Sequence, residues 1–90
     1  MYALVVTYDF DPDTVVYMFK TWDEAVKYMK AMWQMCCSAE KAESPDFDEE
    51  DSKCDEKNGM AELKWKDDAH RYWQVVSVDE PEPIPEEYYA

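Results

Sequence analysis

The residues with the most obvious chemical potential are three aspartates near the N-terminus, Asp9, Asp11 and Asp13. Their alternate spacing matches the first ligand positions of a calcium-binding EF-hand loop. That loop next requires a glycine and ends on a glutamate, whereas this sequence has Thr14 and Lys20 at those positions. The calcium pattern therefore fails, and we expect these aspartates to stabilise a turn.

The side chains that could act as nucleophiles or metal ligands are Cys36, Cys37, Cys54 and the single histidine, His70. Their spacing is not that of a zinc site. Cys36 is expected to be buried, and the acidic surroundings of Cys54 should raise its thiol pKa. His70 falls in a predicted turn, and a single glycine, Gly59, excludes a glycine-rich phosphate loop. We therefore predict no catalytic residue, no cofactor and no metal, so the protein is not expected to be an enzyme.

The charge of the chain restricts its partners. The 90 residues include 22 acidic and 9 basic side chains, which gives a formal net charge of −13. Such acidity opposes direct binding to nucleic acid and to anionic membranes, because both require a basic surface. The sequence has neither a membrane-spanning apolar run nor the basic start of a signal peptide. Together with an odd number of cysteines, this predicts a cytoplasmic protein with reduced thiols.

Most of the negative charge lies in two short segments. Residues 43–56 carry a net charge of −7 and residues 79–90 carry −5, so the rest of the chain is nearly neutral. The first segment has few apolar residues, which predicts an acidic mobile loop at about 43–57. The second contains three prolines, which predicts an extended tail at 80–90. Residues 1–79 are therefore expected to form a single α+β domain.

The strands of this domain are predicted from apolar and alternating patterns. Residues 2–8 and 14–19 are rich in β-branched and aromatic side chains and are joined by an Asp/Pro turn, which indicates an antiparallel hairpin. Residues 60–66 alternate between apolar and polar side chains, and residues 71–78 complete a second hairpin. With a helix between the hairpins, the predicted order is ββαββ. We expect a four-stranded antiparallel sheet with one helix packed on one face.

The helix is expected at about 22–40. Thr21 and Glu24 form a capping-box pattern at its start, and one apolar stripe runs along its length. Tyr28 and Met35 lie beside this stripe and widen it toward one flank. The widened flank indicates a contact surface for a second copy or for another protein. The alternative is ordinary packing against the returning loop or the tail.

The acidic loop offers a second candidate interaction surface, formed by Asp46, Asp48, Glu49, Glu50 and Asp51. Its charge either keeps an aromatic-rich chain soluble or imitates nucleic-acid charge. Our leading hypothesis is a non-catalytic protein–protein interaction module whose partner is another protein or a second copy of itself. One alternative is an acidic inhibitor that mimics nucleic acid and blocks a basic site. Another is a metal-dependent enzyme that uses the loop carboxylates.

Three stretches of the sequence resemble known proteins: YALVVTYDFDPDTVVYMF, TWDEAVKYMKAMW and LKWKDDAHRYWQVVSV. Together they resemble small acidic proteins of unknown function from gut bacteria and their mobile elements, over about residues 1–78. The resemblance implies a cytoplasmic, bacterial protein in a phage or mobile-element setting. Such families have no assigned activity, so the resemblance implies no functional residues.

Overall fold

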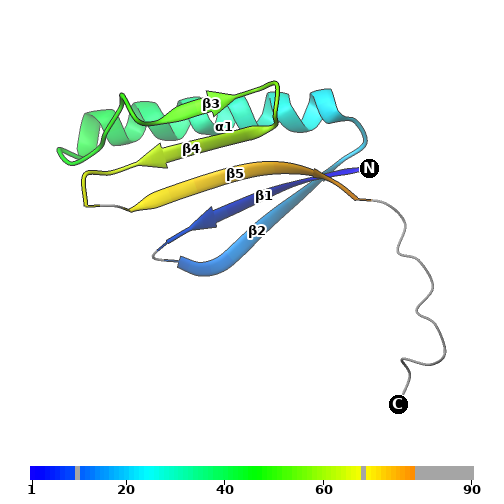
Figure 1. The fold of residues 1–90 in the computed structure, drawn as a ribbon, viewed down its shortest axis with the longest axis horizontal. Coiled ribbons are helices and arrows are strands. Elements are labelled where there is room, and N and C mark those ends of the chain that lie inside the picture. The colour runs from blue at the N-terminus through cyan, green and yellow to red at the C-terminus, as the bar shows by residue number, and fades with distance from the viewer. Residues whose placement is uncertain (10, 68, 79–90) are drawn as a thin grey trace, which may run out of the picture.

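The protein is an α+β structure with one helix and one antiparallel sheet (Figure 1). The computed structural model describes residues 1–9, 11–67 and 69–78. The elements are β1 (Tyr2–Tyr8), β2 (Asp11–Phe19), α1 (Trp22–Glu43), β3 (Lys53–Asp55), β4 (Met60–Lys64) and β5 (His70–Ser77). The sheet has five strands in the order β2-β1-β5-β4-β3. The predicted class and antiparallel pairing are confirmed, but the count of four strands is wrong because β3 adds a fifth.

Strand β1 lies inside the sheet, between β2 and β5. Its register places Leu4 opposite Tyr17 of β2 and Val75 of β5. Leu4 and Val6 are buried in the core, because alternate residues of a strand point to the same face. Helix α1 covers this face, whereas no helix of the described chain covers the other.

Helix α1 begins as the sequence predicts and ends three residues later than expected. The Thr21 side chain accepts a hydrogen bond of 3.2 Å from the backbone N–H of Glu24, which satisfies one free donor of the first turn. Ala25 and Met29 are buried against the sheet. No residue between 40 and 43 disfavours a helix, and the chain leaves it at Ser44, which precedes Pro45.

The acidic segment after α1 lies along the outer side of β4. Phe47 is buried and forms an isolated antiparallel bridge with Trp65. Ser52 is also buried, and its hydroxyl donates to the Asp48 carbonyl (2.7 Å) and accepts from the Lys64 backbone N–H (3.0 Å). The segment therefore has contacts that the expected mobile loop lacks, and its last part is β3. Its mobility in solution remains a prediction, and the predicted tail lies outside the described residues.

A tight turn joins β3 to β4 and requires glycine. Gly59 has a φ of +64°, a conformation that side-chain-bearing residues rarely adopt. A Cβ atom at Gly59 would lie 2.5 Å from the Trp22 ring and 3.1 Å from the Val75 side chain. The Asp55 carboxylate accepts from the backbone N–H (3.2 Å) and side-chain amide (2.8 Å) of Asn58. These contacts hold the hairpin against the start of α1.

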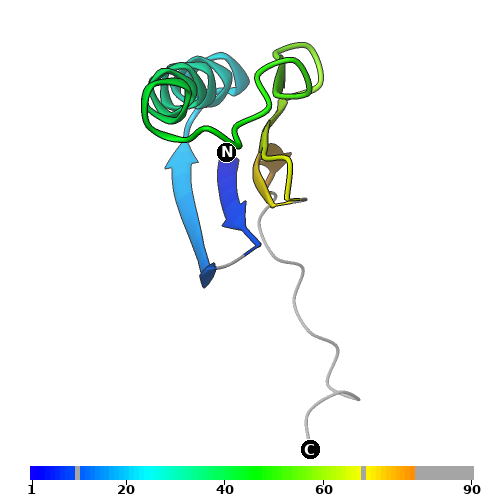
Figure 2. The ribbon, with the colours of Figure 1, turned by 90° about the vertical axis from the view of Figure 1, so that its left-hand side faces the viewer.

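Helix α1 lies next to the β3–β4 hairpin and is joined to it by side-chain contacts. In Figure 2, α1 lies directly above β2, and the β3–β4 hairpin stands beside α1. The helix is linked to this hairpin by a hydrogen bond from the Trp33 indole N–H to the Glu62 carbonyl (2.8 Å) and by the Lys30–Glu56 ion pair (2.6 Å).

Among the described residues, no helix has the length and apolar character needed to cross a lipid bilayer.

Candidate interaction surface

The outer edge of β2 is the first part of the candidate surface. Within the described part of the chain, β2 pairs with β1 alone, so one side of its backbone meets no other strand. Residues 14–19 of this strand carry no charge. Val15, Val16 and Met18 are each about half exposed, at 46%, 51% and 49%. Exposed apolar residues on an unpaired edge are a typical place for another chain to bind.

The flank of α1 above β2 is the second part. The Tyr28 ring lies 5.3 Å from the Tyr17 ring and 5.2 Å from the Phe19 ring, which fixes this flank on the β2 side. Tyr28 remains 41% exposed and Met35 remains 69% exposed. Five residues at helical spacing on this flank carry no charge: Tyr28, Ala31, Met35, Ala39 and Ala42. Of the two residues predicted for this flank, Tyr28 packs its ring on β2, whereas the Met35 side chain is largely exposed.

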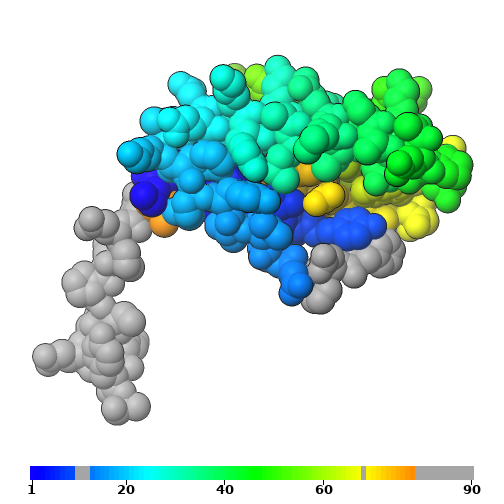
Figure 3. Space-filling view, turned by 180° about the vertical axis from the view of Figure 1, so that it is seen from behind, coloured from blue at the N-terminus to red at the C-terminus, as the bar shows by residue number. Residues whose placement is uncertain are grey.

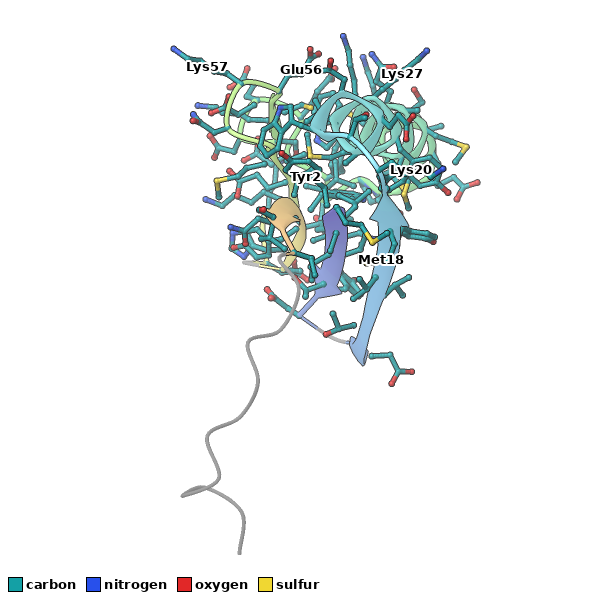
Figure 4. All side chains as sticks on the ribbon, turned by 90° about the vertical axis from the view of Figure 1, so that its right-hand side faces the viewer. Tyr2, Met18, Lys20, Lys27, Glu56 and Lys57 are labelled. Carbon is teal, nitrogen blue, oxygen red and sulfur yellow. The ribbon has the colours of Figure 1, made fainter. Side chains whose placement is uncertain are left out.

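The two parts meet along the β2 edge on one side of the molecule, where Val15 shares the α1 face with Tyr17, whereas Val16 and Met18 point to the face that no described helix covers. Figure 3 shows this side, with α1 running across the top and β2 below it. Figure 4 shows Met18 on β2 and Lys20 just after the end of β2, and Glu56 and Lys57 at the β3–β4 turn. We name the combined region, formed by residues 14–19 of β2 and the Tyr28–Ala42 flank of α1, the β2–α1 surface.

The predicted acidic surface lies elsewhere, and its carboxylates are partly engaged. Glu49 pairs with Lys41 at 3.2 Å, and Asp51 lies 3.9 Å from Lys64. The Asp48 carboxylate accepts from the backbone N–H of Asp51 (3.2 Å). Asp46 and Glu50 are exposed, and the Asp46 carbonyl accepts from the backbone N–H of Lys66 (2.8 Å). The segment thus packs beside the end of α1 and along β4, on the opposite edge of the sheet from β2.

The cysteines are half-buried and form no disulfide. Burial raises the pKa of the Cys37 thiol, and the nearby Glu49 carboxylate raises it further. Burial also raises the pKa of the Cys54 thiol, with a smaller contribution from Glu56. The predicted direction for Cys54 is confirmed, although burial rather than acidity is the larger cause. A raised thiol pKa leaves less of the reactive thiolate at neutral pH.

His70 begins β5 and does not lie in the turn where the sequence pattern placed it. Its backbone N–H donates to the Asp9 carboxylate (2.9 Å), and its ring Nδ1 lies 3.4 Å from the same oxygen. The ring also stacks on Tyr72. His70 therefore links the end of β1 to the start of β5. In the described ranges 1–9, 11–67 and 69–78, no three potential ligand side chains are grouped closely enough to hold a metal ion.

The uncovered face of the sheet carries a shallow hollow of about 470 Å³. It crosses β3, β4, β5 and the end of β1, and its lining includes Met60, Tyr72, Lys53, Asp55 and Glu62. Burial and the Glu62 charge both raise the pKa of Tyr72. The charges in the lining are mixed, so the hollow has no clear preference for an anion or a cation.

Sequence reasoning found the α1 flank but missed the exposed strand beside it. Residues 15–19 are apolar at both odd and even positions, and such a run usually indicates a strand covered on both faces. The structure covers one face with α1 and places the strand at the edge of the sheet. The sequence feature that could have drawn attention to this strand is the absence of charged side chains at residues 14–19. Charged side chains normally prevent an edge strand from pairing with another chain.

Comparisons with protein-family models, with curated protein sequences and with solved structures each returned no significant match.

Proposed function

We propose that this chain is a non-catalytic protein–protein interaction module that acts through the β2–α1 surface. The observation that carries the proposal is that the unpaired edge of β2 lies next to the uncharged flank of α1, with the half-exposed Val15 on the α1 face of the strand. Interfaces place apolar residues at their centre and keep charged residues at the rim. The β2–α1 surface has this pattern, with Asp13 and Lys20 at the two ends of its strand.

Two modes of recognition use surfaces of this kind. An edge strand can pair with a further strand through main-chain hydrogen bonds, and an apolar helix face can pack against another helix. Here the two features lie side by side, because Tyr28 packs on Tyr17 and Phe19 of β2. A single partner can therefore contact the backbone of β2 and the side chains of α1 together.

The charge-mimic alternative has less support from the geometry. A mimic of nucleic acid requires free carboxylates to meet a basic groove, but Glu49 and Asp51 face Lys41 and Lys64. Direct nucleic-acid binding is also disfavoured, because the only arginine, Arg71, is half-buried with its guanidinium 5.4 Å from the Trp73 ring centre.

The proposal is tested by presenting the immobilised chain to a cell lysate supplemented with a labelled copy of the chain. The wild type is compared with Val15→Lys and Met35→Lys, which place a charge on the α1 side of the β2–α1 surface, and with Met60→Lys as the control. Met60 is 48% exposed and Val15 is 46% exposed, so the substitutions are matched in exposure but not in location.

We expect the wild type and Met60→Lys to retain the same proteins or labelled copy, and the two surface variants to lose them. Equal retention by all four chains would contradict the proposal. Loss of every retained protein at high salt, with no effect of the surface variants, would instead support the charge mimic.

A further inference from the structure

The outer side of β2 presents backbone groups that meet no other described strand. In an antiparallel pair, alternate residues direct their N–H and C=O groups toward the partner strand, and the residues between them direct theirs away. From Val15 to Phe19 the register with β1 is regular, so every second residue points its backbone outward. Among the described residues, β2 pairs with β1 alone. The outward groups therefore form a row of donors and acceptors at strand spacing.

Both faces of β2 beside this row are apolar. Val15 and Tyr17 share the face that α1 covers. Val16 and Met18 point to the face that no described helix covers. Val15, Val16 and Met18 are each about half exposed. A strand added beside β2 has the same alternation, so its side chains extend both apolar faces at once.

Helix α1 limits what can occupy this edge, because it lies directly above β2 (Figure 2). Paired strands lie about 4.8 Å apart, whereas packed helices keep their axes about 8–10 Å apart. Two copies joined through β2 would bring their α1 helices to about the strand spacing, which is too close. A helix packed beside α1 has its backbone groups bonded internally, so it leaves the outward row of β2 unpaired. A single extended segment meets neither obstacle.

From these constraints we propose that the β2–α1 surface binds an extended segment of another protein, which joins the five-stranded sheet as a further strand beside β2. The inference rests on the proposed function and names the class of its partner. The segment is apolar at successive positions, and the residues that face β2 keep their backbone N–H, which excludes proline there. Its side chains pack against the α1 flank on one face and extend the row of Val16 and Met18 on the other.

The α1 flank has room for the side chains of such a segment. The Tyr28 ring is held on β2 by the rings of Tyr17 (5.3 Å) and Phe19 (5.2 Å). Met35 lies two helical turns later on the same flank, about 10 Å along the helix, and is 69% exposed. Between them, Ala31 is exposed and has only a methyl group. A side chain of the added strand fits beside Ala31, with a large apolar side chain on either side of it.

The charge of the chain adds a preference at the ends of the partner segment. The formal net charge is −13, yet residues 14–19 and the α1 flank carry none of it. A segment with an apolar centre and basic ends puts no charge on the apolar surface and is attracted by the rest of the chain. Residues 79–90 of this chain, with a net charge of −5 and three prolines, lack that composition. The partner class is therefore an extended apolar segment with basic ends.

The probe is a synthetic peptide with the sequence of β1, YALVVTY, flanked by lysines. This sequence suits the test because β1 already pairs with β2 on its inner side. The peptide carries N-methyl groups on alternate residues, which block one of its edges and prevent it from pairing with itself. The control peptide has the same side chains but is N-methylated on every residue, so neither edge can donate hydrogen bonds.

Isothermal titration of the full chain measures the affinity of each peptide. We expect the control peptide to bind about tenfold more weakly or worse, because it lacks the main-chain donors. Val15→Lys and Met35→Lys should weaken the alternately methylated peptide to a similar extent, whereas Met60→Lys should not, and circular dichroism checks that each variant is folded. Equal binding of the two peptides, or no binding of the alternately methylated one, would overturn the strand inference.

Amide hydrogen exchange of the wild-type chain, followed by NMR, is the second measurement and needs no variant. With the peptide bound, every second amide from Val15 to Phe19 should exchange several-fold more slowly, while the amides of α1 keep their rates. No slowing within β2 would overturn the inference. Retention of the labelled copy without peptide binding would make a second copy the occupant and also overturn it. If the peptide fails but lysate proteins are still retained through Val15 and Met35, the proposed function stands with another kind of partner; if nothing is retained, both fail.

Discussion

The two edges of the sheet are built in opposite ways. At one edge, β3 has three residues, Lys53, Cys54 and Asp55, and charged side chains flank it. The outer side of β4 is covered first by β3 and then by Phe47 at its bridge to Trp65, with the Ser52 hydroxyl bonded to Lys64 between them. At the other edge, β2 has nine residues, of which 14–19 are uncharged. Among the residues that the structure describes, one edge is covered by the chain itself, and the strand at the other edge is paired on one side only.

The difference shows where each edge obtains its stability. The β3 side depends on specific contacts within one chain: a buried ring, a glycine turn and a capped hairpin. The β2 side has few such contacts beyond β1 and the Tyr28 ring, so its apolar residues gain most from a further chain. The β3 side should therefore respond to single substitutions in the monomer more strongly than the β2 side.

The largest effect is expected for Phe47→Ala. Phe47 is the buried anchor of the acidic segment and contacts the Trp65 ring edge-on at 5.8 Å. Removing a buried phenylalanine ring should lower the free energy of unfolding by about 3–4 kcal/mol. Urea denaturation measures this change, with exposed Glu50→Ala as the control expected to stay within about 0.5 kcal/mol. Equal effects of the two substitutions would mean that the acidic segment does not hold the β3 edge.

A smaller but still large loss is expected for Gly59→Ala. The new methyl group meets the Trp22 ring in a backbone conformation with positive φ, so strain and overpacking add. We expect the free energy of unfolding to fall by about 2–3 kcal/mol. Lys57→Ala in the same turn is the control and should change little. A Gly59→Ala chain as stable as the control would show that the hairpin is not fixed against α1.

The corresponding test on the β2 side is Tyr28→Ala. Two ring contacts, to Tyr17 and Phe19, are lost, but the side chain is already 41% exposed. We expect a decrease in unfolding free energy of about 1–2 kcal/mol, measured at a concentration where the chain is monomeric. A loss greater than that of Phe47→Ala would reverse the comparison between the two edges.

The smallest effect is a pH dependence at the β3–β4 turn. Hydrogen bonds from the Asn58 side chain and backbone lower the pKa of Asp55 in the folded chain. Because the folded-state pKa lies below the unfolded-state pKa, the carboxylate contributes stability at neutral pH that is lost as the pH falls through the folded-state pKa. The stability difference between wild type and Asp55→Ala should therefore shrink on acidification. A difference that is constant from neutral to acidic pH would contradict this role of Asp55.

Much of the local structure follows from residue patterns alone. The β-branched run in residues 2–8 predicts β1, the Thr21–Glu24 pattern predicts the start of α1, and the alternation from Met60 predicts β4. The α1 flank at Tyr28 and Met35 also follows from helical spacing. These features depend on neighbours within a few residues, so the sequence is sufficient to identify them.

The sequence did not predict β3 or the path of the acidic segment. Residues 43–57 have a composition typical of a mobile loop, and their negative charge conceals one buried anchor, Phe47. The contact between Phe47 and Trp65 and the role of the Ser52 hydroxyl depend on β4, which follows later in the chain. A pattern confined to the segment cannot reveal these partners.

The sequence by itself therefore determined the α+β class, the order of the main elements and the apolar character of residues 14–19 and of the α1 flank. Only the tertiary structure decided that β2 is an edge, because the position of a strand in a sheet depends on long-range pairing. That pairing places β1 between β2 and β5 and brings the β2 edge beneath Tyr28. An apolar strand that would be buried in the middle of a sheet is thus left at its edge, where we propose that another protein chain binds.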